Sequence, residues 1–226
     1  MTSRGSQRAI SDRLGLQADA SAWCTIDQIP QPPAEVLRAA GTPRLRPGRA
    51  PALDVLGNVL ALPFAPFVMA FVYLARGGKA VERLLAPTSE KQRLRTKHQD
   101  EKRRDALAAE QGLDRVFDGN WQAEAGQFLL RWYSHSPHDE RLVLVTQGDI
   151  VLAAPPRRVS GSREKLMEVV ARLSAAEATV VDPFHGEFET KILLLRFRDG
   201  SWLRVESETP RSELHMHLIR EPLADS

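Results

Sequence analysis

The sequence predicts an α+β protein: a small antiparallel sheet packed against one helix, preceded by a membrane-embedded segment and a charged helical stalk. Three observations support this fold class. One hairpin pattern surrounds Asp199-Gly200, and a second surrounds Gln147-Gly148. A run of 21 residues without a charge, Val55–Ala75, lies well before both hairpins. At 226 residues and 42% apolar content, the chain is long enough for one or two small domains.

Residues 1–51 contain few large apolar side chains and six prolines. After Pro32-Pro33, the stretch AEVLRAA predicts one short helix, with proline at its start and Gly41 past its end. Residues 42–51 (TPRLRPGRAP) predict an extended basic linker. We therefore expect a mostly disordered N-terminal tail over 1–51.

The charge-free run forms the core of a predicted membrane segment over 52–86. As a helix it would be ~31 Å long, close to the ~30 Å hydrocarbon core of a bilayer. Pro63 and Pro66 lie near its middle. Two interior prolines disfavour a helix in water, but a bilayer tolerates them as a kink.

Two sets of residues in this segment carry predictions about its contacts. The candidate lipid-facing or interfacial side chains are Phe64, Phe67, Phe71, Tyr73, Arg76 and Lys79. Small residues recur at every fourth position, at Gly57, Ala61 and Ala65. That spacing lets two membrane helices approach closely, so these three residues are the candidate homodimer contact.

Three structures are compatible with the charge-free run. A single spanning helix agrees with its length and its basic flanks, and is favoured. A hairpin broken at the prolines would enter and leave on one side or lie on the surface. A buried helix of a soluble domain would need apolar partners on every side, and residues 1–54 and 87–115 offer almost none. Lys and Arg counts favour the C-terminal side as cytoplasmic, but if both flanks stay inside, the hairpin becomes the better interpretation.

Residues 88–115 predict a helical stalk that is charged on every side, with no Gly or Pro before Gly112. Leu94 and Leu107 are its main large apolar residues, so the helix has no stripe to bury. Basic residues near a surface attract anionic lipid by ~1 kcal/mol each. The candidates are Lys91, Arg93, Arg95, Lys97, Arg103 and Arg104. Nucleic acid is not the expected partner, because no aromatic residues are interleaved with these charges.

From Phe117 to residue 220 the pattern predicts a compact domain that folds on its own from about Arg115. The expected elements are a strand over 127–133 (QFLLRWY), a hairpin of strands 141–146 and 149–154, a helix capped by Ser162, a strand over 178–181 and a loop over 183–189. The helix is predicted from the helical spacing of Leu166, Val169, Val170 and Leu173.

The clearest local signal is the hairpin over Ile192–Ser207. A three-residue loop over 198–200 would place Gly200 in the left-handed conformation. The core face of the hairpin would then carry Leu193, Leu195, Phe197, Leu203 and Val205. A two-residue turn would scatter these apolar side chains over both faces. The wetter face supplies the candidate partner-binding residues Arg196, Trp202 and Arg204.

The two hairpin stretches, LVLVTQGDIVLAAP and LLLRFRDGSWLRVES, make residues 121–220 resemble the bacterial pleckstrin-homology-like domains. The resemblance implies a curved sheet that binds a lipid headgroup or a protein partner, without catalysis. A predicted helix between the third strand and the later hairpin departs from the family pattern of seven strands followed by one helix. No binding motif of the family carries over residue by residue.

The sequence offers little for catalysis or for metal binding. The close histidine pairs, His135 with His138 and His215 with His217, lack further ligands of suitable type nearby, and Asp182 with His185 has the same status. The single cysteine, Cys24, excludes an internal disulfide. We predict no catalytic residue, no cofactor site and no metal site.

These patterns together predict a non-catalytic binding or scaffolding protein of the cell membrane, with its C-terminal domain in the cytoplasm. Its expected partners are membrane lipid and a protein of unidentified class. One alternative is a soluble oligomer whose apolar helix is buried. A second, less favoured alternative is an enzyme without a recognisable motif.

Overall fold

The computed structural model describes residues 4–27, 29–40, 88–159 and 163–220, and of residue 4 and residues 88–95 only the backbone. The chain divides into two units. The first, here called the folded unit, combines Met1–Pro47 with Gln111–Ser226. The second, the inserted unit, is Gly48–Glu110. The two ends of the chain therefore belong to one fold, and the inserted unit interrupts it.

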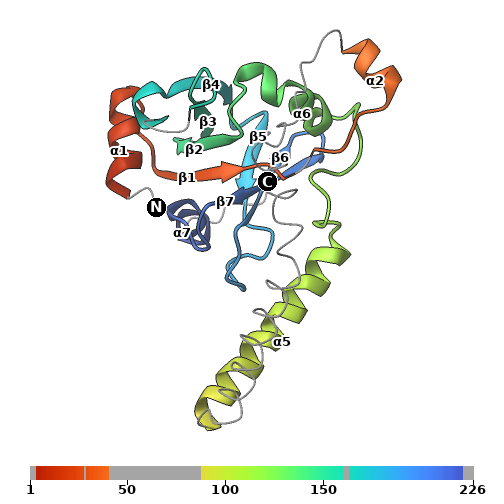
Figure 1. The fold of residues 1–226 in the computed structure, drawn as a ribbon, viewed down its shortest axis with the longest axis vertical. Helices are drawn as coiled ribbons and strands as arrows, with labels where there is room; N and C mark the ends of the chain where they lie inside the picture. The colour runs from red at the N-terminus through yellow and green to blue at the C-terminus, as the bar shows by residue number, and fades with distance from the viewer. Residues whose placement is uncertain (1–3, 28, 41–87, 160–162, 221–226) are drawn as a thin grey trace, which may run out of the picture. The chain divides into compact units, whose positions relative to one another are not determined.

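A seven-stranded sheet forms the centre of the folded unit (Figure 1), and all neighbouring strands in it are antiparallel. The strands are β1 (Ala20–Thr25), β2 (Glu140–Thr146), β3 (Asp149–Ala154), β4 (Glu168–Leu173), β5 (Ala178–Val181), β6 (Ile192–Phe197) and β7 (Trp202–Ser207). Their order is β4-β3-β2-β1-β7-β6-β5, so β1 occupies the middle. Strands β3 and β5 approach each other without pairing, so the sheet is strongly curled.

Strand β1 corrects the expectation of a disordered tail over 1–51. All six of its residues pair with β2, from Ala20 opposite Val145 to Thr25 opposite Glu140. Its last two residues also pair with β7. A helix, α1 (Arg4–Arg13), precedes it, and α2 (Ala34–Ala39) follows it as the sequence predicted. The small residues Ala20 and Ala22 are 1–2% exposed, because the strand is covered on both faces.

Helix α6 (Glu124–His135) occupies the stretch that was expected to be a strand over 127–133. Its buried side chains Ala125, Phe128, Leu129 and Trp132 recur with helical spacing. Its N-terminus has no local side-chain cap. Instead, Asp199 accepts a hydrogen bond from the Glu124 N–H at 2.8 Å, and the Ser201 hydroxyl accepts one from the Ala125 N–H at 2.9 Å. The β6–β7 turn therefore caps a helix 75 residues earlier in the chain.

The prediction of a helix after Ser162 is also wrong. A short 3₁₀ helix, η2 (Arg163–Leu166), is followed directly by β4. The pairing of β4 with β3 shifts register between Leu152 and Ala153, which leaves Val170 as an extra residue. Such a bulge breaks the two-residue alternation of a strand, and this explains why the apolar spacing was typical of a helix.

Both predicted hairpins are confirmed. Strands β2 and β3 meet at Gln147 and Gly148, whose φ angles of 48° and 95° are those of a tight hairpin turn. In the second hairpin Leu195 faces Leu203, and Gly200 takes a φ of 83°. The predicted strand over 178–181 and the loop that follows it are present as well.

Two apolar clusters cover the two faces of the sheet. The larger lies between the sheet and α6 and includes the five predicted core residues of the β6–β7 hairpin. Helix α7 (Glu213–Arg220) adds Leu214 to it. The smaller cluster joins Ile10 of α1 to Trp23, Leu142 and their neighbours on the opposite face. Each fully buried Leu or Val contributes ~1.5–3 kcal/mol, so both faces of the sheet stabilise the fold.

Of the inserted unit, the structure describes α5 (Thr88–Glu110), which confirms a helix over most of the predicted stalk. Lys97 and Arg103 are exposed, and Arg104 is half-buried and bonds Asp105. Among the described residues, no helix combines the length and apolarity that a membrane span requires. The predicted lipid-facing and homodimer residues between Gly57 and Lys79 lie outside the described residues, as do the side chains of Lys91, Arg93 and Arg95.

Candidate functional site

Segments of the folded unit that precede and follow the insertion lie beside one strand, at a site we call the neck. Strand β1 ends with Thr25 opposite Glu206 of β7. Leu203, three residues before Glu206 in β7, forms a β-bridge with Phe117 of the returning chain. Next to it, the Arg204 N–H donates to the Val116 carbonyl at 2.7 Å. The departing and returning segments therefore lie next to the same side of β7, although 91 positions separate Leu113 from Arg204 in the sequence.

Arg204 joins these two segments directly. Its Nη2 donates to a carboxylate oxygen of Asp27, on the departing chain, at 2.9 Å. Its Nη1 donates to the carbonyl of Leu113, on the returning chain, at 2.5 Å. A third partner is Glu206, at 3.2 Å from Nη2. One planar guanidinium thus joins a segment that precedes the insertion to a segment that follows it.

This position corrects the expectation that Arg204 binds a partner on a wet face. Its side chain is 9% exposed, because the returning chain covers this part of β7. Arg196 is exposed and Trp202 is half-buried, as a binding surface requires. The structure places these two opposite each other on β6 and β7, and they remain predictions.

A groove of about 870 Å³ lies along α6, near the β4–β5 and β6–β7 turns. Its apolar lining consists of Phe128, Leu130, Leu173, Phe197 and Ala40. Its polar lining consists of Gln122, Glu124, Gln127, Arg131, Ser134, Glu177 and Arg198. The polar lining therefore includes two acids, Glu124 and Glu177, and two bases, Arg131 and Arg198. The Ser174 hydroxyl donates a hydrogen bond to the Glu177 carboxylate at 2.7 Å. The sequence did not predict this groove, because it assigned α6 to a strand.

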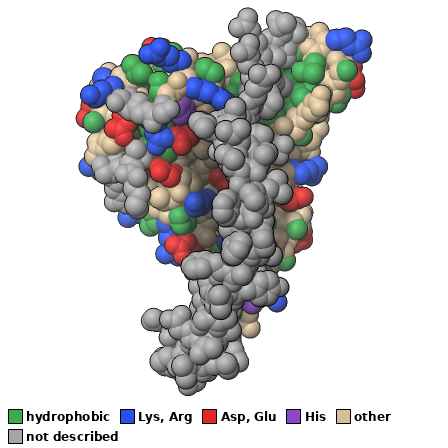
Figure 2. Space-filling view, viewed as in Figure 1, with side chains coloured by type: hydrophobic (Ala, Val, Ile, Leu, Met, Phe, Trp, Pro, Cys, Tyr) green, Lys and Arg blue, Asp and Glu red, His purple; other side chains and the backbone are tan. Residues whose placement is uncertain are grey.

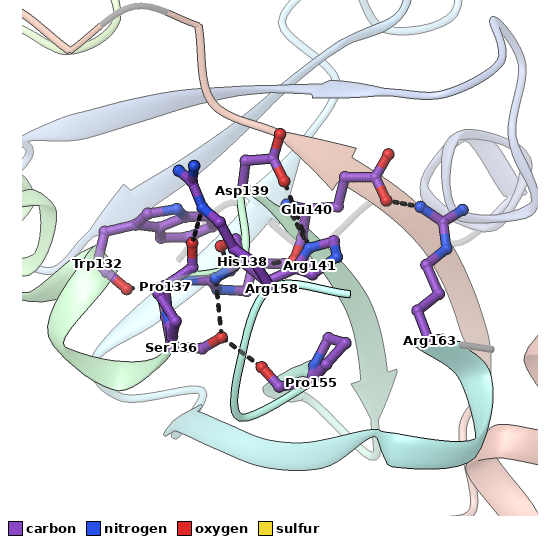
Figure 3. A network of polar contacts seen from close by, with 10 residues as sticks. All are labelled: Trp132, Ser136, Pro137, His138, Asp139, Glu140, Arg141, Pro155, Arg158 and Arg163. Carbon is purple, nitrogen blue, oxygen red and sulfur yellow. Dashed lines mark hydrogen bonds and ion pairs between the residues drawn. The ribbon is translucent and has the colours of Figure 1, made fainter. Parts of the chain in front are cut away.

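Arg141 is the most deeply buried charge of the described residues, at 1% exposure (Figure 3). Its guanidinium donates to the carbonyls of Trp132, Ser136, His138 and Glu140 and stacks on the Trp132 ring at 4.5 Å. Burial lowers its pKa to about 10, against the opposing effects of Tyr133 and Asp139. Two of these carbonyls, those of Trp132 and Ser136, lie at the C-terminal end of α6, so Arg141 satisfies groups that the helix leaves unpaired.

One histidine of each pair makes hydrogen bonds within the fold. His138 is buried, and its Nδ1 accepts the Glu140 N–H at 3.2 Å. Residues 215–217 are part of α7, where His215 bonds the Ser212 hydroxyl and the Ile192 carbonyl. Across the described part of the chain, no three His, Cys, Asp or Glu side chains are grouped to hold a metal ion.

Cys24 is buried in β1, and burial raises the pKa of its thiol. A buried thiol of this kind is a poor nucleophile. Comparison of the chain with protein-family models, curated proteins and solved structures gives no match.

Proposed function

We propose that the protein is a membrane-anchored, non-catalytic binding or scaffolding protein whose folded unit lies on the cytoplasmic side. The observation that carries this proposal is the place of the charge-free run Val55–Ala75. It belongs to the inserted unit, which leaves the fold after β1 and returns before α6. Both faces of the central sheet are already covered, by α6 on one side and α1 on the other.

The charge distribution of α5 supports the same proposal. Its first half, next in sequence to the apolar run, carries four basic residues, Lys91, Arg93, Arg95 and Lys97, against Glu90 alone. Its second half mixes three basic residues with four acids, and there Arg104 bonds Asp105 at 2.8 Å. Anionic lipid attracts the basic half more strongly, because the second half neutralises itself.

The folded unit supplies the binding function in this proposal. Seven strands followed by α7 support a likeness to pleckstrin-homology-like domains, since the helix expected between the third strand and the later hairpin is absent. Helix α6, between β1 and β2, has no counterpart in the family pattern described above. On the outer face of β6–β7, exposed Arg196 and half-buried Trp202 are the proposed contacts with a protein partner.

Flotation with lipid vesicles tests the membrane anchor. The full chain should float with vesicles that contain anionic lipid, and less with neutral vesicles. Changing Lys91, Arg93, Arg95 and Lys97 to Gln should lower flotation with anionic vesicles. A comparison variant changes Lys102 and Arg103 to Gln and should have a smaller effect for each charge removed.

Binding by the variant and control should converge as salt rises, because salt screens charges on the surface. A full chain that is monodisperse without detergent and stays with the aqueous fraction would contradict the proposal.

A further inference from the structure

We infer, resting on the proposed membrane anchor, that the inserted unit makes no net crossing of the bilayer. Its two flanks, and the whole folded unit, then lie on the same side. This differs from the single spanning helix that the sequence favoured. The argument comes from the described strands on either side of the insertion.

The first step is the position of β1. It pairs with β2 along its whole length and with β7 at its end, and both partners follow the insertion in sequence. Trp23 and Cys24 are 1–2% exposed in the two apolar clusters. A single crossing between Thr25 and Phe117 would place β1 on the opposite side from β2 and β7. The sheet could not then form.

The second step is the neck. Arg204 bonds Asp27 of the departing chain and Leu113 of the returning chain. The segments before and after the insertion, at Asp27 and Leu113, therefore lie at one place beside β7. An even number of crossings, or none, is the only arrangement that preserves these contacts.

The third step is length. Two complete crossings need ~17–25 apolar residues each. The charge-free run has 21 residues, enough for one crossing and too few for two. The run alone therefore cannot supply the two complete crossings that would also keep both flanks on one side.

Labelling of single cysteines in sealed vesicles tests this inference. Cys24 is first replaced by Ala, and cysteines are then introduced one at a time at three exposed positions: Glu35, Glu110 and Thr209. Glu35 precedes the insertion, Glu110 is its last residue, and Thr209 marks the folded unit after it. The full-length variants are bound to sealed vesicles that contain anionic lipid, recovered by flotation and treated with a membrane-impermeant maleimide.

The three positions should label to the same extent, with no increase after detergent opens the vesicles. Labelling of one flank only, with the other released by detergent, would overturn the inference and leave the membrane anchor standing. Chains that do not float at all would instead overturn the anchor itself. Thermal unfolding of each variant in the absence of lipid shows that equal labelling does not come from an unfolded chain.

Discussion

The folded unit and the inserted unit use their apolar residues in different ways. In the folded unit, strands and α6 place Leu, Val, Phe and Trp in two clusters on either side of one sheet. On its visible face, acidic and basic side chains are intermixed (Figure 2). The inserted unit concentrates its apolar residues in one charge-free run and its charges in α5. The comparison teaches that the apolar residues that stabilise the fold and those that we propose attach it to a membrane belong to separate parts of the chain.

Removing β1 should have the largest effect on this division. A fragment that begins at Arg115 lacks the central strand, so β2 and β7 lose their common neighbour. We expect no cooperative thermal transition from this fragment. A chain in which Gly48–Glu110 is replaced by a flexible Gly/Ser linker should keep one, because all the described residues of both clusters belong to the folded unit. Circular dichroism during heating measures both, and a cooperative transition in the fragment would contradict the account.

The next effect is in the core of the β6–β7 hairpin. Replacing fully buried Leu203 by Ala should lower the free energy of unfolding by ~2–5 kcal/mol, through lost burial and the cavity left behind. The matched control is Arg196→Ala on the exposed face, with an expected change within ~0.5 kcal/mol. Chemical denaturation of the two variants decides between them. Equal losses of unfolding free energy would mean that the hairpin does not have one buried face and one exposed face.

The neck gives an intermediate effect. Arg204→Ala removes charge-assisted hydrogen bonds to Asp27 and Leu113, and should cost ~1.5–3 kcal/mol. Asp27→Asn should cost less, ~0–1 kcal/mol, because the Asp27 side chain is 62% exposed and solvent screens the ion pair. Urea denaturation measures both losses. If the Arg204→Ala variant has the same free energy of unfolding as the unmodified chain, the neck does not stabilise the fold.

Acidification should have the smallest effect. Burial lowers the pKa of His138 and of His215 below the ordinary value of 6.5. Near His138, Asp139 opposes the shift, while Arg163 and Arg141 add to it. As the pH drops below 6.5, the unfolded chain binds more protons than the native protein, so the free energy of unfolding decreases. The decrease levels off once the pH is below the lowered pKa values of the native histidines.

Denaturation midpoints between pH 7.5 and pH 5 measure this fall. The variant His215→Gln should show a shallower fall than the unmodified chain, since one of the two groups is gone. An unchanged slope would exclude His215 as a source of the pH dependence.

Local sequence signals predicted the parts of the sheet that form between neighbours in the chain. Gly148 and Gly200 occupy positions with positive φ, and alternating apolar residues then determine which residues pair. The helix α5 was predictable for a similar reason, since its composition strongly favours a helix.

The remaining elements depend on residues that lie far away in the sequence. Strand β1 is short and rich in small residues, and its partners begin more than a hundred positions later. Helix α6 receives its cap from Asp199 and Ser201. Arg204 lies between the core residues Leu203 and Val205 of a strand, and this alternation is typical of a solvent-exposed face. In the structure, however, the returning chain covers Arg204. No pattern in a single sequence indicates which distant segment will supply such a cover.

A disulfide between β1 and β7 tests the central claim most directly. Cys24 lies opposite Ser207 in the antiparallel pair. Directly opposed residues have Cα atoms ~4.5–5.5 Å apart, within the range of a disulfide. After oxidation and digestion of the Ser207→Cys variant, mass spectrometry should find the peptide of residue 24 linked to that of residue 207. The link should vanish on reduction and when Cys24 is also changed to Ala. Two free thiols that label readily in the native protein would contradict the claim that β1 completes a sheet across the insertion.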